Sequence, residues 1–187
     1  MRLSILICSL PNRLKKFNVI QDITKQANEY NDVEVLYLGD NKIMSTGDKR
    51  NALINMSSGD YISFVDDDDK VSKDYVKLIR EATKEGKHAI SFNGYYFCND
   101  ALVGAVDYSV SNKKDHNKKV KNNRMIFYRI PNHICAISKA LVKSVMFKSI
   151  SIGEDSDFAK RIKPLIKTET KIEEYIYYYY DVPKKDH

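Results

Sequence analysis

The first third of the chain alternates compact apolar runs with an amphipathic stretch. Leu3 to Cys8 and Val33 to Leu38 have the length and composition of buried strands. Between them, apolar residues recur at helical spacing at Leu14, Phe17, Ile20, Ile23, Ala27 and Tyr30. A strand, a helix and a strand in this order predict two parallel strands joined by a right-handed crossover.

The stretch from Gly47 to Asp69 predicts a short helix, a turn, a buried strand and a cluster of carboxylates. Asp48 is a candidate N-cap for a helix through Met56, and Gly59 suits the turn at its end. Tyr61 to Val65 predicts the strand, and four aspartates follow it directly: Asp66, Asp67, Asp68 and Asp69. Ligands of open α/β sheets bind beyond the carboxyl ends of the strands, so we expect a binding site at this edge.

In the second half, the alternation of helices and strands gives way to consecutive strands. Ser72 is a candidate cap for a helix ending at Gly86, and 88–97 and 102–108 predict two joined strands. Further strands are expected over 125–128 and 133–137, helices after Ser138 and Gly153, and an edge strand over 172–182. The pattern predicts an α/β fold with a Rossmann-like mixed central sheet, flanked by helices and partly antiparallel in its C-terminal half.

Composition narrows the class of protein. A length of 187 residues fits one domain, and 43% hydrophobic with 30% charged residues excludes a disordered chain. The formal charge of +6 suggests an anionic partner such as a nucleotide, a nucleic acid or a membrane headgroup. Cys8, Cys98 and Cys135 are odd in number and lack metal-type spacing, which favours reduced thiols. With no signal-like or membrane-spanning apolar run, the sequence predicts a cytoplasmic enzyme.

Four adjacent carboxylates repel one another and need a partner in a folded protein. Mg²⁺ or Mn²⁺ is the usual partner because both prefer oxygen ligands. A solvated acidic turn that caps the next helix is the alternative. An EF-hand is excluded: with Asp66 as its first position, Val71 stands where the loop needs glycine and Lys77 where it needs glutamate.

Two motifs resemble the family 2 glycosyltransferases, nucleotide-sugar enzymes with the GT-A fold. The first comprises Gly47, Lys49-Arg50-Asn51, Gly59-Asp60-Tyr61-Ile62, Phe64 and the aspartate run, similar to the family's Arg-Asn pair, turn glycine, strand and DxD motif. The second is Gly153-Glu154-Asp155 with Asp157 and Arg161, similar to a late Glu-Asp helix start. The resemblance implies one glycosyltransferase domain over 1–187, with a nucleotide-sugar half over 1–70 and an acceptor half over 86–187.

The resemblance also implies roles at the donor site. Asp68 is the expected metal ligand, with Asp66 and Asp69 as further candidates, and Asp66 and Asp67 would meet the ribose or assist the metal. Ser9, Pro11 and Asp40 would line the nucleotide pocket, where Asp40 would accept a hydrogen bond from a uracil imide. Lys49 and Arg50 would contact the base or the diphosphate. The alternatives are a plain turn aspartate at Asp40 and a solvated helix face for Lys49 and Arg50.

An acceptor hydroxyl needs a base, because it is a poor nucleophile until it loses its proton. By resemblance Asp155 is that base and Glu154 the second choice; alternatively, both only favour a helix N-terminus through its dipole. His133 and Arg129 are expected on the acceptor side, although a partly buried strand histidine is an equal interpretation of His133. The resemblance implies metal-dependent, inverting transfer from a nucleotide-sugar, with a UDP-sugar favoured.

Other functions stay open. The acceptor is a saccharide, a modified nucleobase or a protein. A nucleotidyltransferase of related fold would want a glycine-rich phosphate loop after the first strand, and Ser9 to Arg13 contains no glycine. A nucleic-acid-binding module would use the basic segment 113–124. That segment lies in Ser111 to Arg124, which carries six basic residues and one acidic residue and is expected to be a solvated loop or a flap over a phosphate-bearing ligand.

Overall fold

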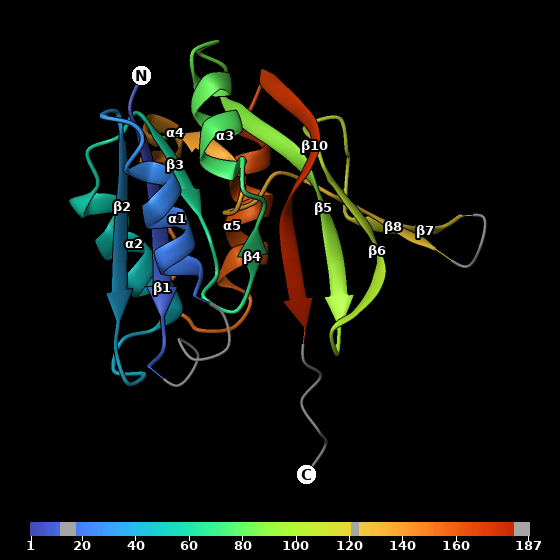
Figure 1. Cartoon of the computed structure of the whole chain (residues 1–187), viewed down its shortest axis with the longest axis horizontal. Coiled ribbons are helices and arrows are strands. Elements are labelled where there is room, and N and C mark those ends of the chain that lie inside the picture. The colour runs from blue at the N-terminus through green and yellow to red at the C-terminus, as the bar shows by residue number, and fades with distance from the viewer. Residues whose placement is uncertain (12–17, 121–123, 182–187) are drawn as a thin grey trace.

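The computed structural model describes residues 1–11, 18–120 and 124–181, and one mixed sheet runs through them (Figure 1). The strands follow the spatial order β2-β1-β3-β9-β5-β6-β8-β7, and β10 pairs with β4 and β5. The strands are β1 Leu3–Ser9, β2 Val33–Gly39, β3 Tyr61–Phe64, β4 Lys70–Val71, β5 Ala89–Cys98, β6 Ala101–Tyr108, β7 His116–Lys119, β8 Met125–Arg129, β9 Ala136–Ser138 and β10 Glu169–Asp181. The helices are α1 Val19–Ala27, α2 Thr46–Met56, α3 Tyr75–Thr83, α4 Lys139–Val145 and α5 Glu154–Ile162, followed by the 3-10 turn η2 Lys163–Leu165.

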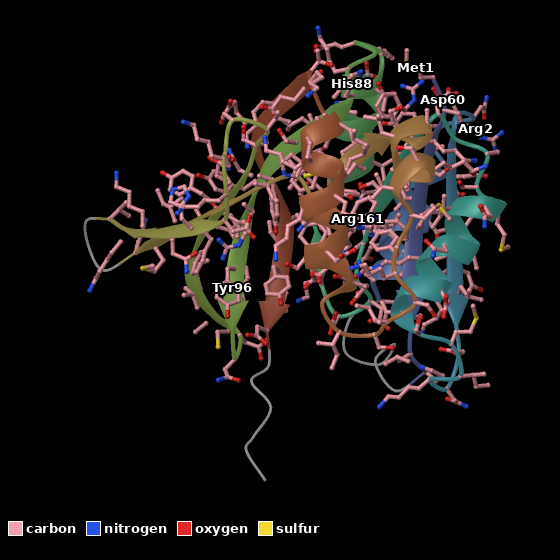
Figure 2. The ribbon with its side chains drawn as sticks, turned by 180° about the vertical axis from the view of Figure 1, so that it is seen from behind. Met1, Arg2, Asp60, His88, Tyr96 and Arg161 are labelled. Atoms are coloured by element: carbon pink, nitrogen blue, oxygen red, sulfur yellow. The ribbon has the colours of Figure 1, made fainter. Side chains whose placement is uncertain are left out.

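The N-terminal half is parallel, as predicted. β1 lies between β2 and β3 and pairs with both in parallel. Leu3, Ile5, Leu6 and Ile7 of β1 are fully buried, because this strand has a neighbour on each side and helices over the sheet. Figures 1 and 2 show α1 and α3 over one face of the sheet and α4 and α5 over the other. Among the described residues, no helix has the length and apolar character needed to cross a membrane.

The second half is partly antiparallel, which confirms the mixed sheet. β5 and β6 form a hairpin whose turn residues, Asn99 and Asp100, have positive φ values of 50° and 63°. Asparagine and aspartate tolerate this conformation better than other non-glycine residues, and two-residue hairpin turns require it. β9 pairs antiparallel with both β3 and β5 and so joins the two halves.

Ser138 is the N-cap of α4, as predicted, but the other two predicted helix caps are wrong by a few residues. Ser45, not Asp48, caps α2: its Oγ accepts a hydrogen bond from the Asp48 backbone N–H at 3.0 Å. Ser72 lies before α3, whose N-cap is Asp74 without a side-chain cap bond. Serine and aspartate are both good caps, so a segment that contains several leaves the start of the helix undecided.

Two further predictions need correction. The predicted C-terminal edge strand is an edge strand only in part: β10 pairs in parallel with β5 along most of its length, and β4 covers its other side at Tyr177 and Tyr178. The basic segment is not wholly a loop, because His116–Lys119 forms strand β7 against β8. The predicted helix positions Leu14 and Phe17, and the end of the segment 172–182, lie outside the described residues.

Candidate functional site

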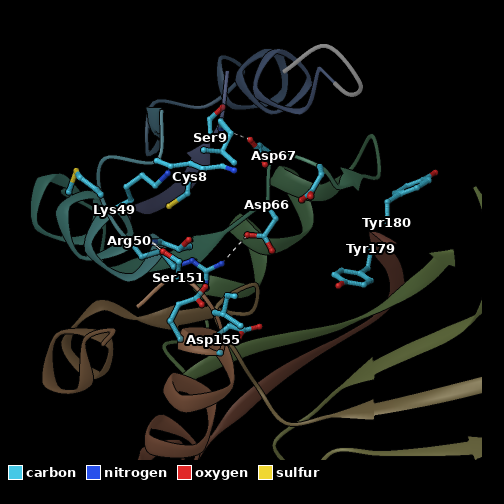
Figure 3. Close-up of a pocket in the computed structure, with 18 of the residues that line it drawn as sticks. Cys8, Ser9, Lys49, Arg50, Asp66, Asp67, Ser151, Asp155, Tyr179 and Tyr180 are labelled. Carbon is cyan, nitrogen blue, oxygen red and sulfur yellow. Dashed lines mark hydrogen bonds and ion pairs between the residues drawn. The ribbon is translucent and has the colours of Figure 1, made fainter. Parts of the chain in front are cut away.

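A cavity of about 930 Å³ opens where β1, β3 and β10 end and α5 begins (Figure 3). A volume of this size suits a ligand as large as a nucleotide-sugar. In Figure 3, Lys49 lies on one side of the cavity, Tyr179 and Tyr180 on the other, and Asp66 between them. Its lining residues are Cys8, Ser9, Leu10, Lys42, Met44, Thr46, Lys49, Arg50, Asp66, Asp67, Asp68, Ser151, Ile152, Gly153, Glu154, Asp155, Tyr179, Tyr180 and Asp181.

Asp66 is held between two nitrogen groups. The Arg50 guanidinium approaches its Oδ1 at 3.1 Å, and His133 Nε2 lies 3.2 Å from its Oδ2. The backbone N–H of Asp66 donates to the Tyr177 hydroxyl at 3.2 Å. His133 is itself buried, and its Nδ1 has no hydrogen-bond partner among the described residues. The aspartate that begins the run is therefore fixed by groups that come from three different elements or loops.

Arg50 is a buried cation surrounded by acids and aromatic rings. Its Nη1 lies 3.5 Å from Glu154 Oε1, and its guanidinium lies 5.5 Å and 5.2 Å from the ring centres of Phe64 and Phe147. Burial would lower the pKa of Arg50, but the negative charges around it, that of Asp66 first, raise it above its usual value. Arg50 therefore stays charged and links the aspartate run to α5.

Asp67 and Asp69 are held by hydrogen bonds to two different strands. Asp67 bonds to the residue that follows β1, and Asp69 bonds to β10. Asp67 Oδ2 accepts the backbone N–H of Leu10 at 2.7 Å. Asp69 accepts the Tyr177 hydroxyl at 2.6 Å and the backbone N–H of Tyr180 at 2.7 Å. Burial, followed by the charge of Asp66, raises the pKa of Asp69 well above its usual range. Asp69 is only 1% exposed and does not line the cavity, a placement that favours a structural role over metal binding.

Asp68 is half-buried and lines the cavity. Within residues 1–11, 18–120 and 124–181, no group of three His, Cys, Asp or Glu side chains has the geometry to hold a metal ion. Mg²⁺ at a nucleotide site needs fewer protein ligands, because it is commonly held by one or two carboxylates together with substrate phosphates. The donor set at this edge, Asp68 with Asp66, fits that kind of site and does not fit an all-protein metal cage.

The predicted nucleotide-binding residues divide into two groups. Ser9, Lys49 and Arg50 line the cavity, and Ser9 Oγ is buried without a hydrogen-bond partner among the described residues. Asp40 lies behind Lys49, whose Nζ donates to Asp40 Oδ1 at 2.6 Å, and this hydrogen bond lowers the pKa of Asp40. The second oxygen of Asp40 accepts the Met44 backbone N–H at 2.6 Å. Pro11 and Asp40 are not among the lining residues.

Another part of the cavity wall is the start of α5. Gly153 is its N-cap with φ +80°, a left-handed conformation that glycine adopts readily. Glu154 is buried against Arg50, and the half-buried Asp155 lines the cavity, where its Oδ1 accepts the Ser156 N–H at 2.7 Å. Arg161, farther along α5, donates to the Val145 and Met146 carbonyls and so ties the helix to the end of α4 (Figure 2). The structure thus brings both predicted base candidates to the sheet edge that carries Asp66 to Asp69, the aspartate edge.

Arg129 does not join this site. It lies on β8, where it donates to Asn117 Oδ1 at 2.9 Å and to the His116 carbonyl, so it ties β8 to β7. Sequence reasoning in turn missed Cys8, Ser151 and Asp181, which line the cavity. The sequence could have indicated them by position, since Cys8 precedes Ser9, Ser151 lies two residues before Gly153, and Asp181 follows the tyrosine run 177–180.

Comparisons with known proteins agree with this architecture. The sequence profile of glycosyl transferase family 2 matches residues 18–148. The similar solved structures include S. aureus TarS 1–349, with a TM-score of 0.61 and 17% identity over 96% of this chain and 60% of that one. They also include TarS 1–349 in complex with UDP-GlcNAc, with a TM-score of 0.60 and 16% identity over 100% of this chain and 60% of that one.

The chain therefore spans about three fifths of the length of these two TarS structures. No curated protein matches it. Likeness at this identity shows a shared fold, and it confirms the predicted GT-A-type architecture. The profile covers more than half of the chain, including the Arg50 helix, β3 and all four aspartates. On this evidence the chain belongs to glycosyl transferase family 2.

Proposed function

We propose that the protein transfers a sugar from a nucleotide-sugar, a UDP-sugar being favoured, to a hydroxyl group of an acceptor. The observation that carries the proposal is the single cavity that gathers Asp66, Asp68, Lys49 and Arg50 together with Asp155. A diphosphate leaving group needs cations near it, and an acceptor hydroxyl needs a base. The TarS structure in complex with UDP-GlcNAc supports a uridine nucleotide as the first donor to test.

The proposed step is a single displacement. The Asp155 carboxylate takes the proton of the acceptor hydroxyl, and the oxygen forms a bond to the anomeric carbon of the donor sugar. The bond between that carbon and the diphosphate oxygen breaks, and its electron pair leaves with the nucleoside diphosphate. In this proposal Lys49 and Arg50 stabilise the departing negative charge, and attack opposite to the leaving group inverts the anomeric centre.

A divalent cation, Mn²⁺ or Mg²⁺, fits the aspartate edge, with Asp68 as its principal protein ligand and Asp66 as the second. Such an ion stabilises negative charge on a diphosphate when bound. Asp66 already pairs with the buried Arg50 guanidinium, so a cation of this chain neutralises part of the aspartate run without an added ion. Asp69 is left out of the proposed ligand set, because both of its oxygens accept hydrogen bonds from β10.

The decisive experiment compares D155N with D157N. Both residues lie in the first turn of α5, so a role limited to the helix dipole predicts similar effects of the two changes. Asp157 pairs with Lys148 and Arg161 at 2.6 Å and does not line the cavity. As a general base, Asp155 predicts a loss of turnover of about 10²–10⁴-fold in D155N.

Donor consumption is measured with UDP-, GDP- and TDP-sugars and Mn²⁺, and donor binding by the thermal shift that UDP produces. We expect D155N to bind UDP like the wild type and D157N to keep its turnover. Equal losses in both variants would remove Asp155 from the mechanism. A protein that neither consumes nor is stabilised by any of these nucleotide-sugars would refute the transferase assignment.

A further inference from the structure

A second hollow, of about 380 Å³, lies on the antiparallel half of the sheet, which extends beyond the helices in Figure 1. Four of its lining residues stand in one row across four strands: Tyr175 of β10, Asn93 of β5, Asp107 of β6 and Tyr128 of β8. Tyr175 is 41% exposed and the other three are half-buried. The row therefore presents a polar centre with a tyrosine at each end.

Both tyrosines are held in place by a second ring. Tyr175 stacks on Tyr95 with ring centres 4.5 Å apart and an angle of 11° between the planes. Tyr128 stacks on His116 of β7 at 4.6 Å and 7°. Three strand spacings separate the tyrosines, which is roughly 14 Å along the row. A span of this width admits more than one sugar ring, and rigid rings lose little conformational entropy when a ligand packs on them.

The centre of the row has groups that recognise hydroxyls and not phosphates. Asp107 accepts Lys171 Nζ at 2.6 Å, and the same ammonium donates to the Tyr108 carbonyl at 2.6 Å. Glu173 adds a second carboxylate, so the lining contains two carboxylates and one ammonium that is already paired. Carboxylate and amide side chains pair well with hydroxyl groups, whereas an excess of carboxylates repels an anion.

Aromatic contacts connect this hollow with the cavity at the aspartate edge. Tyr95 contacts Phe97 at 6.5 Å between ring centres, and Phe97 stacks on Tyr180 at 4.7 Å. Tyr180 lines the large cavity. The four residue steps from Asn93 to Phe97 along β5 span roughly 13 Å. A ligand that reaches both places is thus longer than a single sugar.

We infer that the hollow between Tyr175 and Tyr128 binds a neutral oligosaccharide, as a remote subsite for the acceptor chain. Sugar rings have apolar faces that pack on aromatic rings and hydroxyls that pair with Asn93 and Asp107. The link between this subsite and sugar transfer rests on the proposed function; the binding of an oligosaccharide does not. The subsite makes a long acceptor bind better than a short one.

The test measures binding of neutral hexasaccharides of β-1,4-glucose, α-1,4-glucose and β-1,4-N-acetylglucosamine, and of the matching monosaccharides, by calorimetry without nucleotide. Y175A removes the exposed end of the row, and Y128L removes the other ring while keeping an apolar side chain. Y37A is the matched control, since Tyr37 is 63% exposed on β2 at the opposite end of the sheet. Thermal unfolding and the UDP-induced shift show whether each variant is folded.

We expect at least one hexasaccharide to bind more than tenfold tighter than its monosaccharide, and Y175A and Y128L each to weaken that binding about tenfold. Y37A should leave it unchanged. If no hexasaccharide binds, or if Y175A and Y128L bind it like the wild type, the inference fails, while a UDP-induced shift keeps the proposed function standing. The inference also fails if a dT oligonucleotide binds in a salt-sensitive way and Y175A abolishes that binding. That result would indicate that the hollow binds nucleic-acid bases by stacking, beside the lysines of β7.

Discussion

Arg50 offers the sharpest test of the site's electrostatics. Its side chain is 4% exposed, and the carboxylates of Asp66 and Glu154 lie 3.1 Å and 3.5 Å from its guanidinium nitrogens. Substituting methionine keeps an unbranched apolar stem and removes the charge. Glu154, whose side chain is 7% exposed, then has no cation in contact within the described part of the chain, and breaking a buried ion pair in this way costs about 3–5 kcal/mol.

R80M is the matched control. Arg80 also pairs with a carboxylate, Asp32 at 2.6 Å, but its side chain is 22% exposed and that of Asp32 36%. Exposed ion pairs contribute roughly 0–1 kcal/mol, so R80M should have a small effect. Urea unfolding measures the two free energies, and R50M should also lower Tm by roughly 10 °C for a domain of this length.

The double variant R50M/E154Q separates charge from packing. If the loss in R50M comes from an uncompensated carboxylate, neutralising Glu154 should restore a large part of the stability. The reasoning is refuted if R50M costs no more than R80M. It is also refuted if E154Q adds its own loss to that of R50M, because the guanidinium would then act through its contacts with Phe64 and Phe147.

Three further predictions concern stability and thiol chemistry. The raised pKa of Asp69 means that the folded protein holds the Asp69 proton more tightly than the unfolded chain does. The resulting stabilisation is full below about pH 4 and declines as pH rises. D69N should therefore make the urea midpoint decline less between pH 4 and 7. A Cβ on Gly47 would collide with the Lys148 carbonyl oxygen, so G47A should cost about 1–3 kcal/mol or more in urea unfolding. G153A, where a Cβ meets no atom within 4 Å, should cost only the strain of positive φ, roughly 1 kcal/mol. Burial raises the pKa of Cys135 to about 12, so iodoacetamide at pH 8 should label the half-buried Cys98 before Cys135. Peptide mass spectrometry measures the order of labelling, and faster labelling of Cys135 would contradict its buried position.

Much of the site was predictable because strand ends determine its position. The apolar run before Asp66 places the aspartates at the carboxyl edge of a parallel sheet, and Gly153 opens the helix that faces them. The direction of each carboxylate was not predictable, since a turn of consecutive residues has no simple period. Asp69 points at Tyr177 and Tyr180, and those contacts depend on the pairing of β10, a strand more than 100 residues away.

The pairing of Tyr177 and Tyr178 with β4 was missed for a similar reason. A run of tyrosines suits a strand of any position, because tyrosine combines β propensity with a polar group that tolerates solvent. Only the pairing with both β4 and β5 buries Tyr177 and turns its hydroxyl into a partner of the aspartate run. Arg129 was misplaced for the same reason: its position near His133 in the chain does not reveal that β8 carries it toward β7.

The bonds of Asp67 and Asp69 have a consequence for hydrogen exchange. The backbone amides of Leu10 and Tyr180, near opposite ends of the chain, each donate to a carboxylate of the same four-residue run. Hydrogen exchange at either amide requires its hydrogen bond to the aspartate to break, so a ligand that stabilises Asp66 to Asp69 should slow exchange at both amides. Deuterium uptake at Leu10 and Tyr180 would then report occupancy of the aspartate edge, even for a ligand that touches neither residue.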